Sequence, residues 1–214
     1  MRALPHELYG AKQVRELDRA AIERLGIDGY ALMERAGEAA YARLRERWSD
    51  ARRVAVLCGT GNNGGDGFVV ARLAQRDGLD VCVLQLGERD RIGGSAAQAC
   101  EAARSAGVRW EDYDGGALEG FDLLVDALLG TGLNGEVAEL WSGAIAAMNA
   151  AAAPTLAIDV PSGLSADTGA VLGRAVQAAT TVTFIGLKPG LFTGEGPACC
   201  GEVCFEDLGV PTGT

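Results

Sequence analysis

Five short runs of almost entirely apolar residues, separated by longer helix-like segments, constrain the fold of this chain most strongly. The runs are VAVLC (54–58), VCVLQL (81–86), DLLVDALL (122–129), TLAIDV (155–160) and VTFIG (182–186). Because these runs lack alternation of polar and apolar residues, they predict strands covered on both faces, as in parallel sheets. The remaining expected elements are helices at 66–78, 93–107 and 137–150, a weaker strand at 108–112 and a closing strand at 202–207. This order predicts an α/β fold, a three-layer αβα sandwich with a doubly wound, mostly parallel sheet.

Two further helices are expected before the first strand. One face of the first carries Val14, Leu17, Ala21 and Leu25, and one face of the second carries Met33, Ala36, Ala40 and Leu44. The spacing is typical of amphipathic helices, of which Gly26 ends the first and Trp48 marks the end of the second. With 214 residues, the chain has room for one sizeable domain, which we place at 1–214. We therefore predict a Rossmann-like domain with two additional N-terminal helices.

The overall charge and composition exclude several classes of partner. The formal net charge of −10 disfavours nucleic acid and anionic membranes, because both would be repelled. An anionic small molecule needs local backbone N–H groups, a lysine or a bound cation to hold it. The most apolar stretch, 144–160, is interrupted by Asn149, Pro154 and Asp159 and predicts no membrane span. The N-terminal sequence contains no apolar signal-peptide segment, so we expect a cytoplasmic protein.

The cysteines do not form a recognisable metal-binding pattern. Cys199, Cys200 and Cys204 cluster near the end of the chain, but the only histidine is His6. A zinc site needs four ligands with characteristic spacing, and disulfides are rare outside secreted proteins. We expect neither a zinc site nor disulfides.

Three unusual segments follow predicted strands. They are GTGNNGGDG (59–67), DALLGTGLNG (126–135) and DVPSGLSADTG (159–169). In open α/β sheets, ligands bind beyond the carboxyl ends of the strands, where the strand order reverses. We expect these three segments to converge on one ligand site.

The first segment matches the G-x-G-x-x-G spacing of dinucleotide-binding loops, which is a weak signal. A dehydrogenase would also use an acid such as Glu88 or Asp90 for the ribose, and a glycine-rich turn without a ligand is a further alternative. The segment lacks the lysine and hydroxyl residue of a P-loop. Its Asn62, Asn63 and Asp66 instead supply donors and acceptors that suit a different ligand-binding loop.

Two aspartates and one lysine stand out at predicted strand ends. Asp126 and Asp159 lie in apolar strands, where a carboxylate is costly unless it is paired or coordinated. The alternatives are a helix N-cap or turn aspartate for Asp126 and a satisfied buried acid for Asp159. Lys188 follows the last long apolar run and either faces the ligand or is an ordinary solvated lysine.

Taken together, four motifs resemble the NAD(P)H-hydrate epimerases, the YjeF N-terminal domain family. The motifs are GNNGGDGFVVARLA, DLLVDALLGTGL, AIDVPSGLSADTG and VTFIGLKPGL. The N-terminal segment RELDRAAIERLGIDGYALMERAG is similar to the family's opening segment, and the resemblance runs from about residue 11 to residue 208.

The resemblance implies an isomerase that interconverts the R and S forms of hydrated NADH and NADPH in nicotinamide nucleotide repair. It implies a bound potassium ion and functional coupling to an ATP- or ADP-dependent dehydratase, and we also expect a homodimer. It implies that Asn63, Asp126 and Ser162 would bind the potassium ion. From its position at a strand end facing the expected pocket, Asp159 is the first candidate for a catalytic residue, and Lys188 is the second. The substrate would contact Asn62, Asn63, Gly64, Gly65, Asp66, Gly130, Thr131, Gly132, Leu133, Asn134, Gly135, Glu136 and Asp159.

One segment departs from the family. Many relatives have an arginine near the phosphates after GTGL, whereas this chain has Asn134-Gly135-Glu136. Two other functions remain open at this point: an NAD(P)-dependent oxidoreductase and a non-catalytic nucleotide-binding or scaffold module. The first needs a catalytic histidine or a Tyr-x-x-x-Lys motif, and neither is evident in the sequence.

Overall fold

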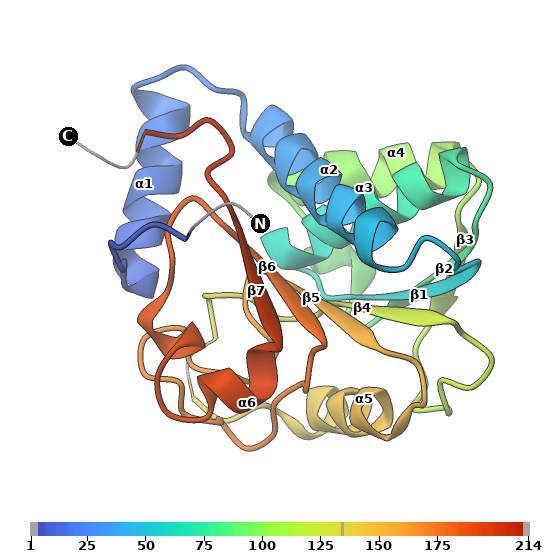
Figure 1. Cartoon of the computed structure of the whole chain (residues 1–214). Helices are drawn as coiled ribbons and strands as arrows, with labels where there is room; N and C mark the ends of the chain where they lie inside the picture. Colours follow the sequence, from blue (N-terminus) through green and yellow to red (C-terminus); the bar gives the residue numbers. More distant parts are fainter. Residues whose placement is uncertain (1–3, 134, 212–214) are drawn as a thin grey trace.

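The computed structural model describes residues 4–133 and 135–211, which form a single seven-stranded sheet flanked by helices. Figure 1 shows helices above and below this sheet. The elements are α1 (Ala11–Glu23), α2 (Gly29–Arg47), β1 (Arg53–Cys58), α3 (Asn62–Arg76), β2 (Asp80–Gln85), η1 (Arg89–Arg91), α4 (Gly94–Ser105), β3 (Arg109–Asp112), β4 (Leu123–Ala127), α5 (Glu139–Ala150), β5 (Thr155–Ile158), β6 (Thr180–Phe184), η2 (Pro189–Leu191), α6 (Gly196–Cys200) and β7 (Glu202–Glu206).

The strands run in the order β3-β2-β1-β4-β5-β6-β7, and neighbouring strands pair in parallel throughout. The chain builds outward from β1 to β3 on one side and from β4 to β7 on the other, so the order reverses between β1 and β4. Ligands bind at such switch points in α/β folds. The expected three-layer, doubly wound α/β architecture is confirmed, with only parallel pairs among the described strands.

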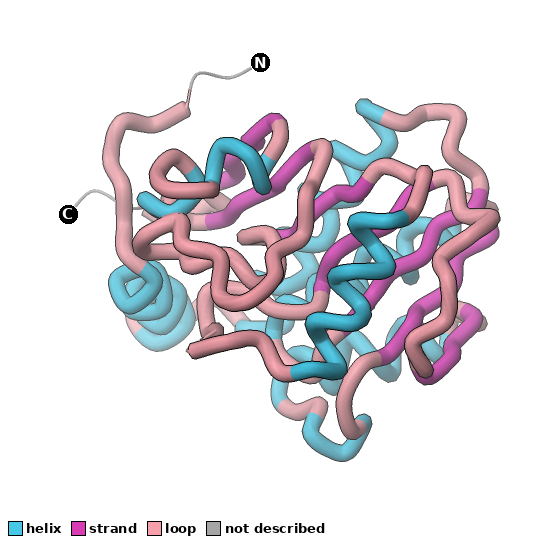
Figure 2. The backbone as a smooth tube through the Cα atoms, turned by 90° about the horizontal axis from the view of Figure 1, so that it is seen from below, coloured by secondary structure: helices cyan, strands magenta, loops and turns pink. Residues whose placement is uncertain are grey.

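Both faces of the sheet are covered by apolar side chains, as the uninterrupted strand sequences predict. On β1, Val54, Val56 and Cys58 pack into the cluster that includes α2, α3 and α4. Ala55 and Leu57 point to the other face and join the cluster that includes α5. Figure 2 shows that second face from below, where a helix and long loop segments lie across the strands. The site described below is therefore supported by strands that are buried on both sides.

The glycine-rich segment begins a helix instead of forming a loop. The sequence predicts a helix over 66–78, whereas α3 starts at Asn62. A β-carbon on Gly64 would lie 2.1 Å from Gly59 O, and one on Gly67 would lie 2.5 Å from Ala127 Cβ. These glycines thus allow the first turns of α3 to pack directly against the ends of β1 and β4.

Helix α1 lies apart from the other N-terminal helix. Figure 1 shows α1 beside the C-terminal segment, while α2 packs with α3 and α4. The preceding residues are tied to the segment after β6, because Tyr9 N donates to Leu187 O at 2.7 Å. Ala11 N donates to Asp167 Oδ1 at 2.6 Å. These contacts place α1 next to the segments that follow β5 and β6.

Three short elements, η1, η2 and α6, were not expected from the sequence. Helix α6 and the turn η2 lie between β6 and β7, where the sequence predicts only a connection. Cys199 and Cys200 of α6 are buried and, together with Leu191 of η2, pack against Val160. Because they are buried among apolar side chains, these two cysteines contribute to packing of the core. No helix within the described part of the chain has both the length and the apolar composition needed to cross a bilayer.

Candidate functional site

A cavity of about 530 Å³ lies at the carboxyl ends of β1, β4, β5 and β6. Its walls come from α1, α2, the first turn of α3 and the segment after β4. Its volume lies within the range of small-molecule sites, and its position agrees with the expectation for a doubly wound sheet. The three segments singled out in the sequence all contribute to this cavity or to the residues directly behind it.

Asp126 lies at the end of β4 and is completely buried. Its carboxylate accepts hydrogen bonds from Ser162 Oγ at 2.6 Å, from Ser162 N at 2.8 Å and from Leu128 N at 3.2 Å. Burial raises the pKa of Asp126 to about 6, and these hydrogen bonds oppose the increase. The aspartate therefore connects the segment after β4 to the segment after β5.

Asn63 completes a cluster of oxygen atoms beside Asp126. Its Nδ2 donates to Leu129 O at 3.0 Å, and Ser162 Oγ, whose single hydrogen is donated to Asp126, lies 3.1 Å from the same carbonyl oxygen. Asn63 Oδ1 is buried and has no hydrogen-bond partner in the structure. A buried amide oxygen without a partner is unfavourable unless water or an ion contacts it. Amide, carbonyl, hydroxyl and carboxylate oxygens in one place are donors that suit a hard cation.

Asp159 follows β5 and is held by Lys188. Lys188 Nζ donates to Asp159 Oδ1 at 2.5 Å, to Phe184 O at 2.8 Å and to Thr183 Oγ1 at 2.9 Å. Lys188 is fully buried, whereas 17% of the Asp159 side chain is exposed. An ammonium group has three N–H donors, so these contacts use all of them. The structure thus places Lys188 behind Asp159, whereas the sequence left open that it faces the ligand at the mouth of the cavity or is an ordinary solvated lysine.

Two residues of the cavity adopt strained backbone conformations. Asp159 and Ile185 have φ values of 67° and 66°. Each is the central residue of a three-residue turn, in which Val160 N donates to Ile158 O and Gly186 N donates to Phe184 O. Such turns are rare, and positive φ is especially unfavourable for a β-branched residue. Strain of this kind clusters at functional sites, so it supports assigning this cavity a function.

Two more carboxyl groups line the cavity with Asp159. Burial and the nearby charges of Asp159 and Asp18 raise the pKa of Asp66 well above its usual value. Burial and the charge of Asp159 also raise the pKa of Asp18. Three carboxyl groups close together favour the protonated form of at least one, because like charges repel in a poorly solvated site. The cavity can therefore contain both a protonated carboxyl group and a carboxylate.

The residues expected to bind the substrate separate into those that line the cavity and those that do not. The lining includes Asn62, Asn63, Asp66, Gly130, Thr131, Gly132, Leu133 and Asp159. Gly64 and Gly65 are buried below the surface of the cavity, and a β-carbon on Gly65 would lie 2.5 Å from Met33 Sδ. Gly135 and Glu136 are exposed and are not part of the lining, and Asn134 is outside the described residues.

The sequence did not identify several residues of the site. Arg15 and Asp18 reach the cavity from α1, Trp141 from α5, and Thr183 holds Lys188 from β6. On α1, Arg15 and Asp18 are polar residues adjacent to the apolar face formed by Val14 and Leu17. That pattern is also typical of an ordinary solvated helix surface, so it contained no specific signal.

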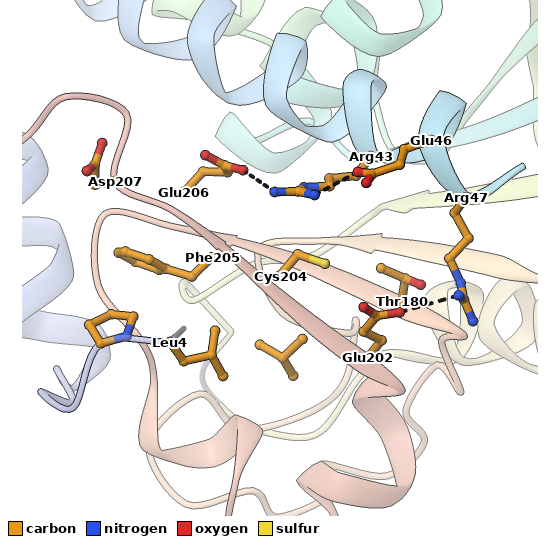
Figure 3. Close-up of a pocket in the computed structure, with 12 residues that line it drawn as sticks. Leu4, Arg43, Glu46, Arg47, Thr180, Glu202, Cys204, Phe205, Glu206 and Asp207 are labelled. Atoms are coloured by element: carbon orange, nitrogen blue, oxygen red, sulfur yellow. Dashed lines mark hydrogen bonds and ion pairs between the residues drawn. The ribbon is translucent and has the colours of Figure 1, made fainter. Parts of the chain in front are cut away.

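A second hollow of about 500 Å³ lies at the sheet edge between α2 and β7 (Figure 3). Its two arginines pair with three glutamates: Arg43 contacts Glu206 at 2.9 Å and Glu46 at 2.7 Å, and Arg47 contacts Glu202 at 3.4 Å. None of the site residues expected from the sequence lines it. These ion pairs connect the edge strand to α2, and we assign this hollow no ligand.

Two arrangements of the cysteines were considered from the sequence, a zinc site and disulfides. All are free thiols, and within residues 4–133 and 135–211 no cluster of three or more His, Cys, Asp or Glu side chains is arranged to bind a metal. A cation bound by amide, hydroxyl and carbonyl oxygens would not produce such a cluster, so this result does not bear on the oxygen atoms around Asn63.

Comparisons with known proteins agree on one family. The model for the YjeF-related protein N-terminus matches residues 29–190. A bifunctional NAD(P)H-hydrate repair enzyme of Coxiella burnetii is 48% identical over 203 residues, which are 95% of this chain and 41% of that protein. An NAD(P)H-hydrate epimerase of Limosilactobacillus fermentum is 39% identical and is matched over 92% of this chain and 94% of its own length.

A solved structure supports the fold independently. The crystal structure of the yeast protein ynu0 superposes with a TM-score of 0.80 at 22% identity and covers 93% of this chain and 87% of its own. The chain spans about two fifths of the length of the bifunctional relatives. Since the family model and the sequence relatives both cover most of this chain, it belongs to the YjeF N-terminal domain family.

Proposed function

We propose that this protein is an isomerase that interconverts the R and S forms of hydrated NADH and NADPH. The observation that carries the proposal is the carboxylate of Asp159, which Lys188 holds at the wall of a cavity formed by the family's motifs. The names of the epimerase and repair-enzyme relatives support it. Because the bifunctional relatives are longer, we also propose coupling to a separate dehydratase activity. The expected homodimer stays a prediction.

The chemistry begins at C6 of the hydrated ring, which carries both a hydroxyl group and the ring nitrogen. A proton donated to the hydroxyl oxygen lets the C6–O bond break, so water leaves and the nitrogen lone pair forms an iminium cation. Water then adds to the opposite face of C6 and loses a proton to a base. Atoms and charge balance, because one water molecule and one proton leave and one of each returns.

Asp66 and Asp159 supply the two functions that this chemistry needs. The raised pKa of Asp66 favours the protonated form, which suits an acid for the departing hydroxyl. Asp159 is paired with Lys188, and its carboxylate stabilises the positive charge that develops on the ring. It also accepts the proton of the incoming water, and that proton returns to Asp66 through solvent in the cavity before the next turnover. Lys188 orients Asp159 through Oδ1, while Oδ2 lies near Gly130 on the cavity side.

We also propose that Asn63, Asp126 and Ser162, with the carbonyl of Leu129, hold a potassium ion. The unpartnered oxygen of Asn63 and the buried carboxylate of Asp126 support this set of ligands. A bound cation would contribute positive charge that offsets the buried carboxylate of Asp126 and favours binding of an anionic substrate to an acidic protein. The ion takes no part in the bond-breaking steps, which depend on the groups around Asp159.

The proposed reaction is tested by supplying the R-hydrate of NADH together with a dehydratase that acts only on the S form. The protein should accelerate consumption of the R-hydrate well above the spontaneous epimerisation measured without it. No acceleration would contradict the proposal. Hydride transfer to an added carbonyl substrate would instead indicate an oxidoreductase, and ligand binding without turnover would indicate a binding module.

A further inference from the structure

The cavity contains more negative than positive charge, although its proposed substrate is an anion. Asp18, Asp66 and Asp159 line it, and Arg15 is the cationic side chain among the described lining residues. Lys188 is buried behind Asp159, and its donors are used by Asp159, Thr183 and Phe184 O. A diphosphate therefore has one cationic side chain in this cavity with which to pair.

Arg15 projects from α1 over the segment that follows β4. Its Nη1 donates to Thr131 O at 2.9 Å, which ties the guanidinium group to this segment. Guanidinium has five N–H donors, so this single bond leaves donors for an anion. Within the described residues, no carboxylate forms an ion pair with Arg15. The segment itself, 128–137, contains no lysine or arginine.

Neighbouring contacts place Arg15 close to the start of α3. A β-carbon on Gly130 would lie 3.4 Å from Asn63 Cβ and 3.6 Å from Asp159 Oδ2, so Gly130 lies between these side chains. Thr131, the partner of Arg15, is the next residue. Helix α3 has no side-chain hydrogen bond at its N-cap, Gly61, which lines the cavity. Uncapped helix N-termini favour anions, and arginine forms strong bidentate contacts with phosphate.

We propose that Arg15 is the cationic contact for the diphosphate of the dinucleotide substrate, opposite the N-terminus of α3. The inference rests on the proposed function for the identity of the substrate. Arg15 is bonded to Thr131, one residue beyond the glycine that lies beside Asp159, and this separation from Asp159 suits a substrate in which a ribose separates the reacting ring from the diphosphate.

The test compares Arg15→Gln with Arg19→Gln. Arg19 lies one turn further along α1, is paired with Glu23 at 3.9 Å and is not part of the cavity lining. Both changes remove one positive charge from the same helix, so a difference between them reports on the cavity. The probes are ADP-ribose, which contains the diphosphate but no nicotinamide ring, and hydrated NADH. Calorimetry gives the dissociation constant of the first, and the coupled dehydratase assay gives KM and kcat for the second.

We expect Arg15→Gln to weaken ADP-ribose binding and to raise KM about tenfold, with kcat within about twofold of wild type, as for the loss of one charge-assisted contact. Arg15→Lys should recover part of this loss, and Arg19→Gln should resemble wild type. Added salt should weaken ADP-ribose binding to wild type more than to Arg15→Gln.

Three results would overturn the inference. They are an Arg15→Gln dissociation constant within about twofold of wild type, an equal loss in Arg19→Gln, and no binding of ADP-ribose by the wild-type protein. Because ADP-ribose binding does not depend on turnover, failure of the epimerase reaction would leave the assignment of Arg15 standing. Conversely, full epimerase activity with unchanged ADP-ribose binding in Arg15→Gln would reject only that assignment.

Discussion

The ends of β4 and β5 each present an aspartate, but the protein surrounds the two carboxyl groups differently. Asp126 is completely buried and accepts hydrogen bonds from neutral groups of Ser162 and Leu128. Asp159 is partly exposed to the cavity, pairs with a buried lysine and occupies a strained turn. The first arrangement fixes the shape of the site, whereas the second directs a charged oxygen toward a ligand.

The difference shows why burial alone does not identify a catalytic group. Asp126 is the more deeply buried of the two, yet its oxygens contact backbone and hydroxyl donors that stabilise the ionised form. Asp159 keeps one oxygen on the cavity side while Lys188 and Thr183 hold the other. We therefore propose that the end of β4 contributes stability and cation binding, and that the end of β5 contributes the base for proton transfer.

Among the residues that hold Asp159 in place, Lys188→Met is expected to have the largest effect on kcat. Methionine preserves most of the buried volume but removes the ammonium group, so Asp159 loses the contact that orients it. We expect kcat to fall between about tenfold and a hundredfold, typical of the loss of acid–base positioning, with a smaller change in KM. Steady-state kinetics in the coupled assay measure both constants.

Thr183→Val is the matched control for this prediction, because it removes one acceptor of Lys188 but keeps the lysine. It should reduce kcat less than Lys188→Met, and Thr183→Ser should restore the wild-type value. A Lys188→Met protein with normal kcat and a raised KM would show that the lysine contributes to binding and does not position Asp159.

Potassium should stabilise the wild-type protein through the end of β4. An ion that binds only the folded state raises stability by mass action, and at a hundredfold excess over the dissociation constant this corresponds to about 2.7 kcal/mol. We expect a higher melting temperature in potassium chloride than in sodium chloride at matched ionic strength. Asp126→Ala should abolish this difference.

Asp122→Ala is a suitable control, because this partly exposed aspartate accepts hydrogen bonds from Arg52 and Arg53 at the opposite end of β4. It should lower the melting temperature without changing the difference between the two salts. Equal melting temperatures of the wild-type protein in both salts would remove the proposed potassium site.

The smallest expected effect on stability concerns Asp66 and depends on pH. The pKa of Asp66 is higher in the folded than in the unfolded protein. The contribution of Asp66 to stability is therefore fully present below its unfolded-state pKa, near pH 4, and is lost as the pH rises through its folded-state pKa. Asn cannot ionise, so Asp66→Asn does not lose this stability, and its urea midpoint at pH 7 should lie above that of the wild type. The gain should disappear toward pH 4.

The same variant separates stability from activity. Asp66→Asn should lose turnover although it gains stability at pH 7, because its amide cannot protonate the departing hydroxyl. Urea titrations at several pH values, read by tryptophan fluorescence, provide the stability, and the coupled assay provides the rate. A variant that is less stable at neutral pH, or that keeps the wild-type rate, would contradict the role given to Asp66.

The sequence predicted the frame of the site better than its details. Apolar runs and the three unusual segments placed Asp126 and Asp159 at strand ends, because strand burial and chain order are local features. The burial of Lys188 was not predictable, since it depends on how Thr183 and Phe184 O surround the ammonium group. Arg15 and Asp18 were missed because the sequence predicts α1 but not where α1 packs.

The most direct test of this division of function is the exchange rate between the R and S hydrates at saturating substrate, measured by NMR for Asp159→Asn and Asp126→Asn beside wild type. Asp159→Asn should keep the fold and bind the hydrate with a dissociation constant within about tenfold of wild type. Its exchange rate should nevertheless fall by on the order of a hundredfold or more. Asp126→Asn should lose stability but exchange the hydrate at close to the wild-type rate once the rate is corrected for the folded fraction. A nearly wild-type rate in Asp159→Asn would contradict the assignment of the chemistry to the end of β5.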